Sequence, residues 1–93
     1  MGTFHHDKHA LHGITVIVET HGPEIFIGRC DDIVAEGVLL RDADVHREGD
    51  PAAGGKSRAD FLDHARRFGA WPNLSRILVP AANVREIRRL GEI

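Results

Sequence analysis

Histidines near the start of the chain are the first residues whose types and spacing suggest chemistry. His5 and His9 are one helical turn apart, so their imidazoles could bind one metal ion from the same face of a helix. A frayed terminus with a single helical turn accounts for the segment 1–13 without a metal. We therefore expect no metal centre and no cofactor, and a metal would be held, if anywhere, by His5 and His9.

Two pairs of carboxylates follow, Asp31 with Asp32 and Asp42 with Asp44. Paired carboxylates can transfer protons or bind a hard cation. No His or Lys stands at motif spacing from either pair, so we interpret them as surface or interface residues. Cys30 is the one cysteine, which excludes an intrachain disulfide, and we expect it to be buried and unreactive. The sequence therefore predicts no catalytic residues and no enzyme activity.

The run Gly-Gly-Lys-Ser at residues 54–57 resembles part of a phosphate-binding loop. That motif needs an upstream glycine, a buried strand before it and a helix after it in a parallel βαβ unit. Pro51 occupies the position of the upstream glycine, and this sequence cannot build a parallel sheet. We reject a nucleotide site here.

Length and charge limit the classes of function. The 93 residues and 10.3 kDa make one domain at 14–93 after a His-rich segment at 1–13. A domain of this size has a thin core, for which oligomerisation is a common remedy. The net charge of -2 argues against broad electrostatic binding of nucleic acid, so such binding needs a local patch. Without a membrane-spanning run or a secretory signal, we expect a cytoplasmic protein with no membrane contact.

Hydrophobic alternation predicts the elements that position these residues. Alternating β-branched and apolar residues predict strands at 14–20, 24–33, 38–45 and 75–80. Gly28, inside the second strand, predicts a sharp bend or a close approach of two backbones. The segment 84–90 fits either a strand or a short helix, because its apolar residues do not alternate strictly.

An insertion at 46–74 separates the third strand from the fourth. Its first part is rich in Gly and Pro and predicts a loop. Ser57 and Asp60 have the spacing of a capping box, which predicts a helix over 58–68. We expect Phe61, Phe68 and Trp71 to pack on the chain's own sheet or to close one end of it. The alternative is that the segment 57–71 binds a protein partner.

The order of strands, turns and insertion resembles that of a five-stranded SH3-like barrel, and two motifs resemble the Sm-like (LSm) family. The first motif, with its Phe-x-Gly and Asp-Ala pairs, is similar to the positions held by Gly22, Phe26, Gly28, Cys30, Ile33, Val34, Gly37, Val38, Leu40, Asp42 and Ala43. The second, Ile-Arg-Gly-Asp-Asn-Val-x-x-Ile, is similar to residues 79–87. The resemblance implies an all-β, five-stranded SH3-like small barrel of Sm type with a helix-containing insertion between strands three and four.

The sequence departs from the family at the RNA-binding loops. The positions that line the family's pore and hold bases are occupied here by Val34, Gly37, Pro80 and Ala81. These residue types neither pair with a base edge nor stack on a base. The resemblance therefore implies at most weak RNA binding, through Asn83, Arg85 and Arg76. The arginines would otherwise form a solvated or intersubunit face.

The resemblance also implies self-association. Sm-like subunits pair the fourth strand of one copy with the fifth of the next and close a ring, which removes exposed sheet edges. We therefore expect a cyclic homo-oligomer of about five to seven subunits. The residues expected at its interface are Arg76, Ile77, Leu78, Val79, Val84 and Ile87.

Together these features predict a non-enzymatic, ring-forming binding or scaffold module. An alternative resemblance is to PRC-barrel domains, whose last strands read as an apolar run, a proline and then a valine, as residues 79–84 do. That resemblance would imply a monomeric or dimeric adaptor that docks on a protein partner.

Overall fold

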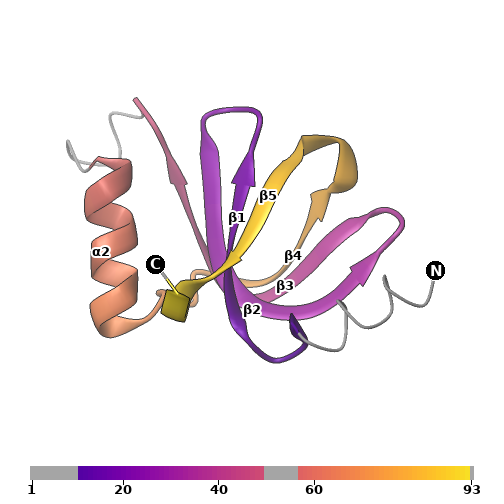
Figure 1. Ribbon diagram of the computed structural model, residues 1–93, viewed down its shortest axis with the longest axis horizontal. Coiled ribbons are helices and arrows are strands. Elements are labelled where there is room, and N and C mark those ends of the chain that lie inside the picture. Colours follow the sequence, from indigo (N-terminus) through magenta and orange to yellow (C-terminus); the bar gives the residue numbers. More distant parts are fainter. Residues whose placement is uncertain (1–10, 50–56, 93) are drawn as a thin grey trace.

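The structure, a computed structural model, describes residues 11–49 and 57–92. The metal candidates His5 and His9 and the residues 50–56 lie outside these ranges. The described residues form one open antiparallel sheet of five strands in the order β4-β3-β2-β1-β5, with one α-helix against it (Figure 1). The strands are β1 (Thr15–Thr20), β2 (Glu24–Val34), β3 (Gly37–Arg47), β4 (Leu74–Pro80) and β5 (Val84–Arg89). The helices are α2 (Arg58–Phe68) and the short 3-10 turns η2 (Ala81–Asn83) and η3 (Leu90–Glu92).

The predicted bend at Gly28 is confirmed. A Cβ at Gly28 would lie 2.7 Å from the Cβ of Ala43, closer than two such atoms approach. Here β3 carries one residue more than β2, because Ile27 pairs with Asp44 while Arg29 pairs with Arg41. The extra residue makes a β-bulge, and such bulges bend a strand. Both strands curve strongly along their length (Figure 1).

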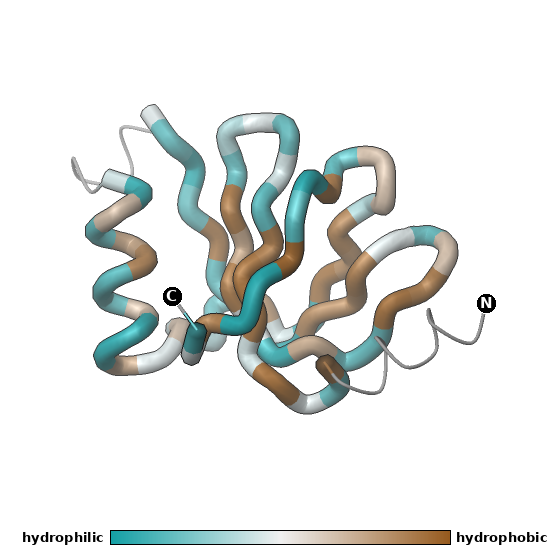
Figure 2. Tube along the Cα trace, viewed as in Figure 1, coloured by the Kyte–Doolittle hydropathy of each residue, from teal (hydrophilic) through white to brown (hydrophobic). Residues whose placement is uncertain are grey.

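One hydrophobic cluster receives side chains from all five strands. Apolar residues concentrate along the middle of the strands (Figure 2). Cys30 is fully buried here, as expected. The buried members of this cluster are Val16, Val18, Cys30, Val38, Leu40, Ala43 and Val79, and the partly buried ones include Leu74, Ile77, Val84 and Ile87.

A second cluster lies on the opposite face of the sheet, because alternate residues of a strand point to opposite faces. Ile17, Ile25 and Ile27 pack there against Phe61 and Ala65 of α2, and Leu90 of η3 joins them. The strand β1 is therefore buried on both faces.

The helix α2 begins and ends where its caps predict. The Ser57 hydroxyl accepts a hydrogen bond from the Asp60 backbone N–H at 3.1 Å, and the Asp60 carboxylate accepts one from the Ser57 N–H at 3.2 Å. The expectation that the helix packs on its own sheet is correct for Phe61, which is 7% exposed. It is wrong for Phe68 and Trp71, which are 74% and 62% exposed.

The C-cap of α2 explains why Phe61 is buried whereas Phe68 and Trp71 are exposed. Gly69 has a φ of 83°, a conformation that glycine adopts without strain and that ends the helix. The chain turns there, and Ala70 packs against the second cluster. Phe68 and Trp71, on either side of this contact, remain outside it.

The segment 84–90, whose apolar spacing also fits a helix, is a strand over Val84–Arg89, and its final residue, Leu90, begins η3. The strand β5 pairs with β1 through Glu19 opposite Glu86 and then Thr20 opposite Val84, so Arg85 is an extra residue. This irregularity brings Val84 and Ile87, three positions apart, onto the same core cluster. The helix-like spacing of the apolar residues therefore results from a bulge within a strand.

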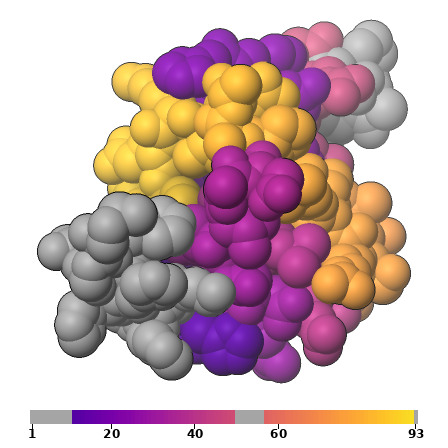
Figure 3. All heavy atoms as spheres, turned by 90° about the vertical axis from the view of Figure 1, so that its right-hand side faces the viewer, coloured from indigo at the N-terminus to yellow at the C-terminus, as the bar shows by residue number. Residues whose placement is uncertain are grey.

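A tight corner connects β2 to β3 and receives the end of β4. Gly37 pairs with Pro80, and the Ala81 N–H donates a hydrogen bond to the Glu36 carbonyl at 2.8 Å. A Cβ on Gly37 would overlap the carbonyl oxygen of Val79 and lie 2.9 Å from the Ala81 nitrogen. Figure 3 looks onto this end of the molecule, where η2 lies over the corner, with β4 and β5 on its two sides.

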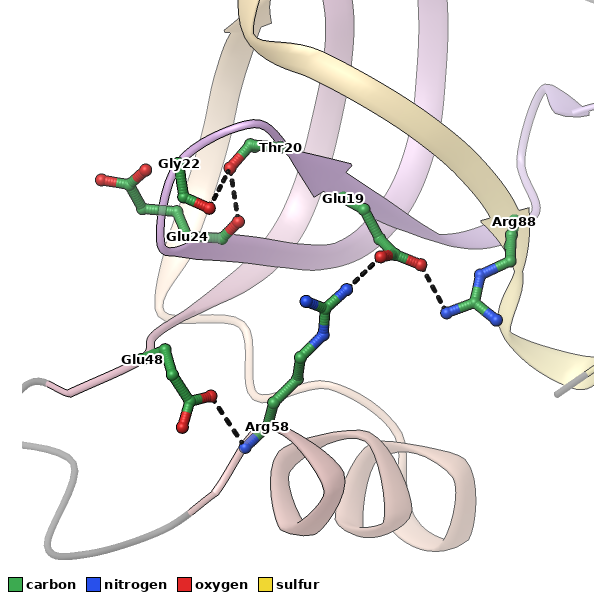
Figure 4. A network of polar contacts seen from close by, with 7 residues as sticks. All are labelled: Glu19, Thr20, Gly22, Glu24, Glu48, Arg58 and Arg88. Atoms are coloured by element: carbon green, nitrogen blue, oxygen red, sulfur yellow. Dashed lines mark hydrogen bonds and ion pairs between the residues drawn. The ribbon is translucent and has the colours of Figure 1, made fainter.

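A buried carboxylate joins the helix α2 to the strands β1 and β5. The side chain of Glu19 on β1 is 9% exposed and lies between Arg58 of α2 and Arg88 of β5, with which it forms an ion pair at 2.6 Å (Figure 4). The Arg58 backbone N–H also donates to the Glu48 carboxylate at 3.2 Å. A buried charge is costly unless it is paired, so Glu19 requires both arginines.

The corner at Gly37 can be tested by adding one methyl group. Gly37→Ala would force Val79 and Ala81 apart and place alanine at a φ of 152°. We expect the free energy of unfolding to fall by about 2–4 kcal/mol in urea denaturation. Gly91→Ala, where a Cβ meets nothing within 4 Å, is the matched control and should change it by less than about 0.5 kcal/mol. Equal stability of both variants would contradict this account.

The ion pairs of Glu19 give a second expectation. Glu19→Gln removes the charge but keeps the shape, and should lower the free energy of unfolding by about 1–3 kcal/mol, because two arginines lose their partner. Glu24→Gln breaks a more exposed pair with Arg47, 2.8 Å long, and should cost less than about 1 kcal/mol. The free energies of unfolding of both variants are to be measured by urea titration in low and in high salt. Salt should reduce the loss in the Glu24 variant more, because it screens the exposed ion pair more strongly. An equal loss in both would show that Glu19 is not a special contact.

Candidate functional site

The two edges of the sheet are the most extensive candidate surface. Among the described residues, β4 pairs only with β3, and β5 pairs only with β1. The outer edge of each strand therefore presents a row of backbone donors and acceptors without a partner strand. Such an edge is a template for pairing with another chain. The strands β4 and β5 are the first and the last in the order of the curved sheet, and the short turn η2 joins one to the other (Figure 1).

The residues expected at a subunit interface lie on these edges. On β4, Arg76 is exposed, Leu78 is 42% exposed and Ile77 is half-buried. Val79 is 1% exposed and belongs to the core, so only its backbone is available to another chain. Val84 and Ile87 on β5 are half-buried and pack inward. An edge contact would therefore combine backbone pairing with side chains such as Leu78.

The expected RNA contacts are divided between two places. Asn83 and Arg85 are exposed beside η2, where the Asn83 carbonyl accepts a hydrogen bond from the His21 N–H at 3.0 Å. Arg76 lies in the first half of β4, away from this turn. The structure thus brings Asn83 and Arg85 together but places Arg76 in a different setting.

Arg76 belongs to a row of arginines that the sequence did not predict. Arg76 pairs with Arg41 of β3, and Arg41 pairs with Arg29 of β2. All three are exposed, on the face away from the first core cluster. Directly opposed residues have Cβ atoms about 4.5–5.5 Å apart, and like charges in this position repel each other. Of the ion pairs among the described residues, one belongs to this row, between Arg41 and Asp31 at 3.3 Å.

Such a row is suited to binding anions. Three guanidinium groups on neighbouring strands, compensated by one carboxylate, concentrate positive charge on a chain whose net charge is -2. Arginine binds phosphate with a fork of donors, and a phosphate chain would relieve the mutual repulsion. Arg29 follows the Gly28 bend and Arg41 precedes the bulge, so their pairing depends on a register shift that the sequence alone does not specify.

The carboxylates and the thiol have structural settings. The pKa of the Cys30 thiol is raised, mainly by burial and further by the charges of Asp32 and Asp31. A thiol that is buried and held neutral is a poor nucleophile. Asp44 accepts hydrogen bonds from the Asn73 side chain and from the Val45 N–H, both at 2.9 Å. These two hydrogen bonds hold Asp44 against the segment that leads into β4.

The described residues were also compared with what a metal site or a membrane span requires. Within residues 11–49 and 57–92, no three His, Cys, Asp or Glu side chains are grouped so as to hold a metal ion. His46 is buried, stacks on the Phe61 ring at 5.2 Å and has its Nε2 3.4 Å from a Glu48 carboxylate oxygen, which places it in the contact between α2 and the sheet. In the part of the chain that the structure describes, no helix has the length and apolar character needed to cross a membrane.

Comparison with known proteins adds no family assignment. The sequence matches no protein-family model, and no curated protein is significantly similar to it.

Proposed function

We propose that this chain is a non-enzymatic, self-assembling binding module, folded as a small barrel of Sm type, that forms a cyclic homo-oligomer of about five to seven subunits. The observation that carries this proposal is that β4 and β5 are the edge strands of one curved sheet and that neither has a second partner strand among the described residues. Two sequence motifs of this chain resemble the Sm-like family, in which subunits associate through their fourth and fifth strands. Their lengths differ by one residue, with seven residues in β4 and six in β5.

The packing of the sheet supports the barrel part of the proposal. All five strands send side chains into one cluster, as they would around the axis of a small barrel. The close approach at Gly28 supplies the bend that a short sheet needs in order to curl. Pairing of β4 with the β5 of a neighbour would cover both edges and would add buried surface to a thin core.

The row of Arg29, Arg41 and Arg76 favours RNA as the ligand of the assembly. In a cyclic oligomer each subunit repeats the row, so a phosphate chain would meet it several times and gain avidity. Asn83 and Arg85 would add contacts beside η2. The binding would be electrostatic rather than base-specific, because Val34, Pro80 and Ala81 cannot read base edges.

The competing proposal is a monomeric or dimeric adaptor that resembles PRC-barrel domains. It is favoured by the exposed Phe68 and Trp71, which a partner protein would cover. The mass in solution separates the two proposals directly.

Assembly through the edges can be tested by charging one of them. Size-exclusion chromatography with light scattering should give a mass several times that of the 10.3 kDa chain. Leu78→Lys places a charge on the β4 edge and should shift the mass to that of a monomer. Val45→Lys is the matched control, because Val45 is similarly exposed, at 38% against 42%, but does not lie on an edge strand. A wild-type monomer, or equal masses for both variants, would refute the assembly.

RNA binding can be tested by filter binding of short U-rich and A-rich RNAs at several salt concentrations. Replacing Arg29, Arg41 and Arg76 together by Gln should weaken binding at least about tenfold. It should also reduce the slope of log affinity against log salt by about two, since each phosphate contact to a single strand contributes roughly 0.7. Arg66→Gln with Arg67→Gln removes two arginines outside the row and should leave both quantities unchanged. No binding by the wild type at low salt would remove the RNA proposal.

A further inference from the structure

Each edge strand carries one exposed charge that has no counterpart within the subunit. Arg76 lies on β4 and Glu86 on β5, and both are exposed. Among residues 11–49 and 57–92, no ion pair or side-chain hydrogen bond involves either of them. Arg88 of β5, by contrast, is paired with Glu19 at 2.6 Å. Arg76 and Glu86 are therefore available to charged groups of another molecule.

Within its own sheet, each of these two side chains lies opposite a residue of the same charge. Arg76 pairs with Arg41 of β3, and Glu86 pairs with Glu19 of β1. Directly opposed side chains of like charge destabilise a sheet. Because β4 and β5 are edge strands, the second position beside each charge is left for a strand of another molecule. An opposite charge in that position would relieve the repulsion.

Both charges lie on the face of the sheet away from the first hydrophobic cluster. Ile77, next to Arg76, and Ile87, next to Glu86, pack against that cluster, and neighbouring residues of a strand point to opposite faces. A strand of a second copy that continues the sheet also continues its two faces. When β4 pairs antiparallel with β5 of a second copy, Arg76 and the Glu86 of that copy can therefore lie directly opposite each other.

The register that joins these two charges also matches the apolar residues. Since Arg85 is the extra residue of β5, Ile77 then lies opposite Val84 of the second copy, and both point to the core side. A shift of two residues in one direction keeps the faces but places Arg76 opposite Arg88, cation against cation. A shift in the other direction leaves Arg76 beyond the start of β5. The distribution of charge therefore favours one register over its neighbours.

We propose that Arg76 of one subunit and Glu86 of the next form an ion pair across the junction and thereby fix the register in which β4 pairs with β5. This inference rests on the proposed assembly and names the contact that specifies it. An exposed ion pair adds little affinity, so backbone pairing and apolar contacts would hold the strands together while the charges select their alignment. A guanidinium has several N–H donors, so Arg76 can bind the carboxylate and a phosphate at the same time.

The pair can be tested by exchanging its charges. Arg76→Glu and Glu86→Arg each put like charges opposite each other at every junction. Each should raise the protein concentration at half-assembly, measured by light scattering over a dilution series, at least about tenfold. Neither change threatens the fold, because each gives the neighbour in its own sheet, Arg41 or Glu19, an opposite charge. Arg29→Glu makes the same change of charge on β2, which is not an edge strand, and should have no effect.

An equimolar mixture of the two single variants shows whether the charges meet between subunits. When the Arg76→Glu and Glu86→Arg chains alternate around an even-membered ring, every junction again joins an acid to a base. The mixture should therefore assemble at a concentration at which neither variant does so alone. Native mass spectrometry should find the two chains in equal numbers, because they differ in mass. The chain that carries both changes should assemble like the wild type for the same reason.

The possible failures of this inference and of the assembly are distinguishable. A wild type that assembles while both single variants assemble equally well, or single variants whose mixture stays dissociated, would overturn the ion pair. Assembly through the edges would then stand on the Leu78→Lys result alone. An effect of Arg29→Glu as large as that of Arg76→Glu would also overturn the pair, because total charge would then be the cause. A wild-type monomer at every concentration would overturn both proposals.

Discussion

The carboxylate of Glu19 is the contact on which the arrangement of the other elements depends. It lies on β1, whose residues enter both apolar clusters, and it receives an arginine from the helix and another from the last strand. Apolar contacts can slide, because they are not directional. A buried charge with two cationic partners cannot slide without large cost, so it sets the position of α2 and β5 relative to β1. The hydrophobic clusters supply the free energy, and Glu19 supplies the alignment.

The burial of β1 on both faces leaves two separate surfaces exposed for the functions that we propose. One face of the sheet encloses the main core, and the helix covers part of the other. Within residues 11–49 and 57–92, the two edges have no partner strand and the arginine row is exposed on the sheet, while the pocket lined by the exposed Phe68 and Trp71 is formed entirely by the insertion. In our proposals, assembly and partner binding use different segments, so one could change without the other.

Local signals in the sequence predicted local structure well. The capping pair of Ser57 and Asp60 fixed the start of the helix, and Gly28 indicated the bend, because each of these effects acts between neighbouring atoms. Features that depend on register were missed. The alignment of Arg29 with Arg41 and Arg76 needs the bulge at Asp42, and the helix-like spacing in β5 needs the bulge at Arg85. The exposure of Phe68 was missed because it depends on where the chain turns at Gly69 and on the contact of Ala70, both of which are tertiary.

The insertion leaves and re-enters the sheet close to one strand. Glu48, just after β3, accepts a hydrogen bond from the start of the helix, and Asp44 of β3 accepts one from Asn73, just before β4. These two hydrogen bonds therefore hold the insertion close to β3 near both of its ends. A segment anchored in this way can be shortened, lengthened or replaced during evolution while strand pairing is retained. The same property makes it a natural graft point for a foreign recognition loop.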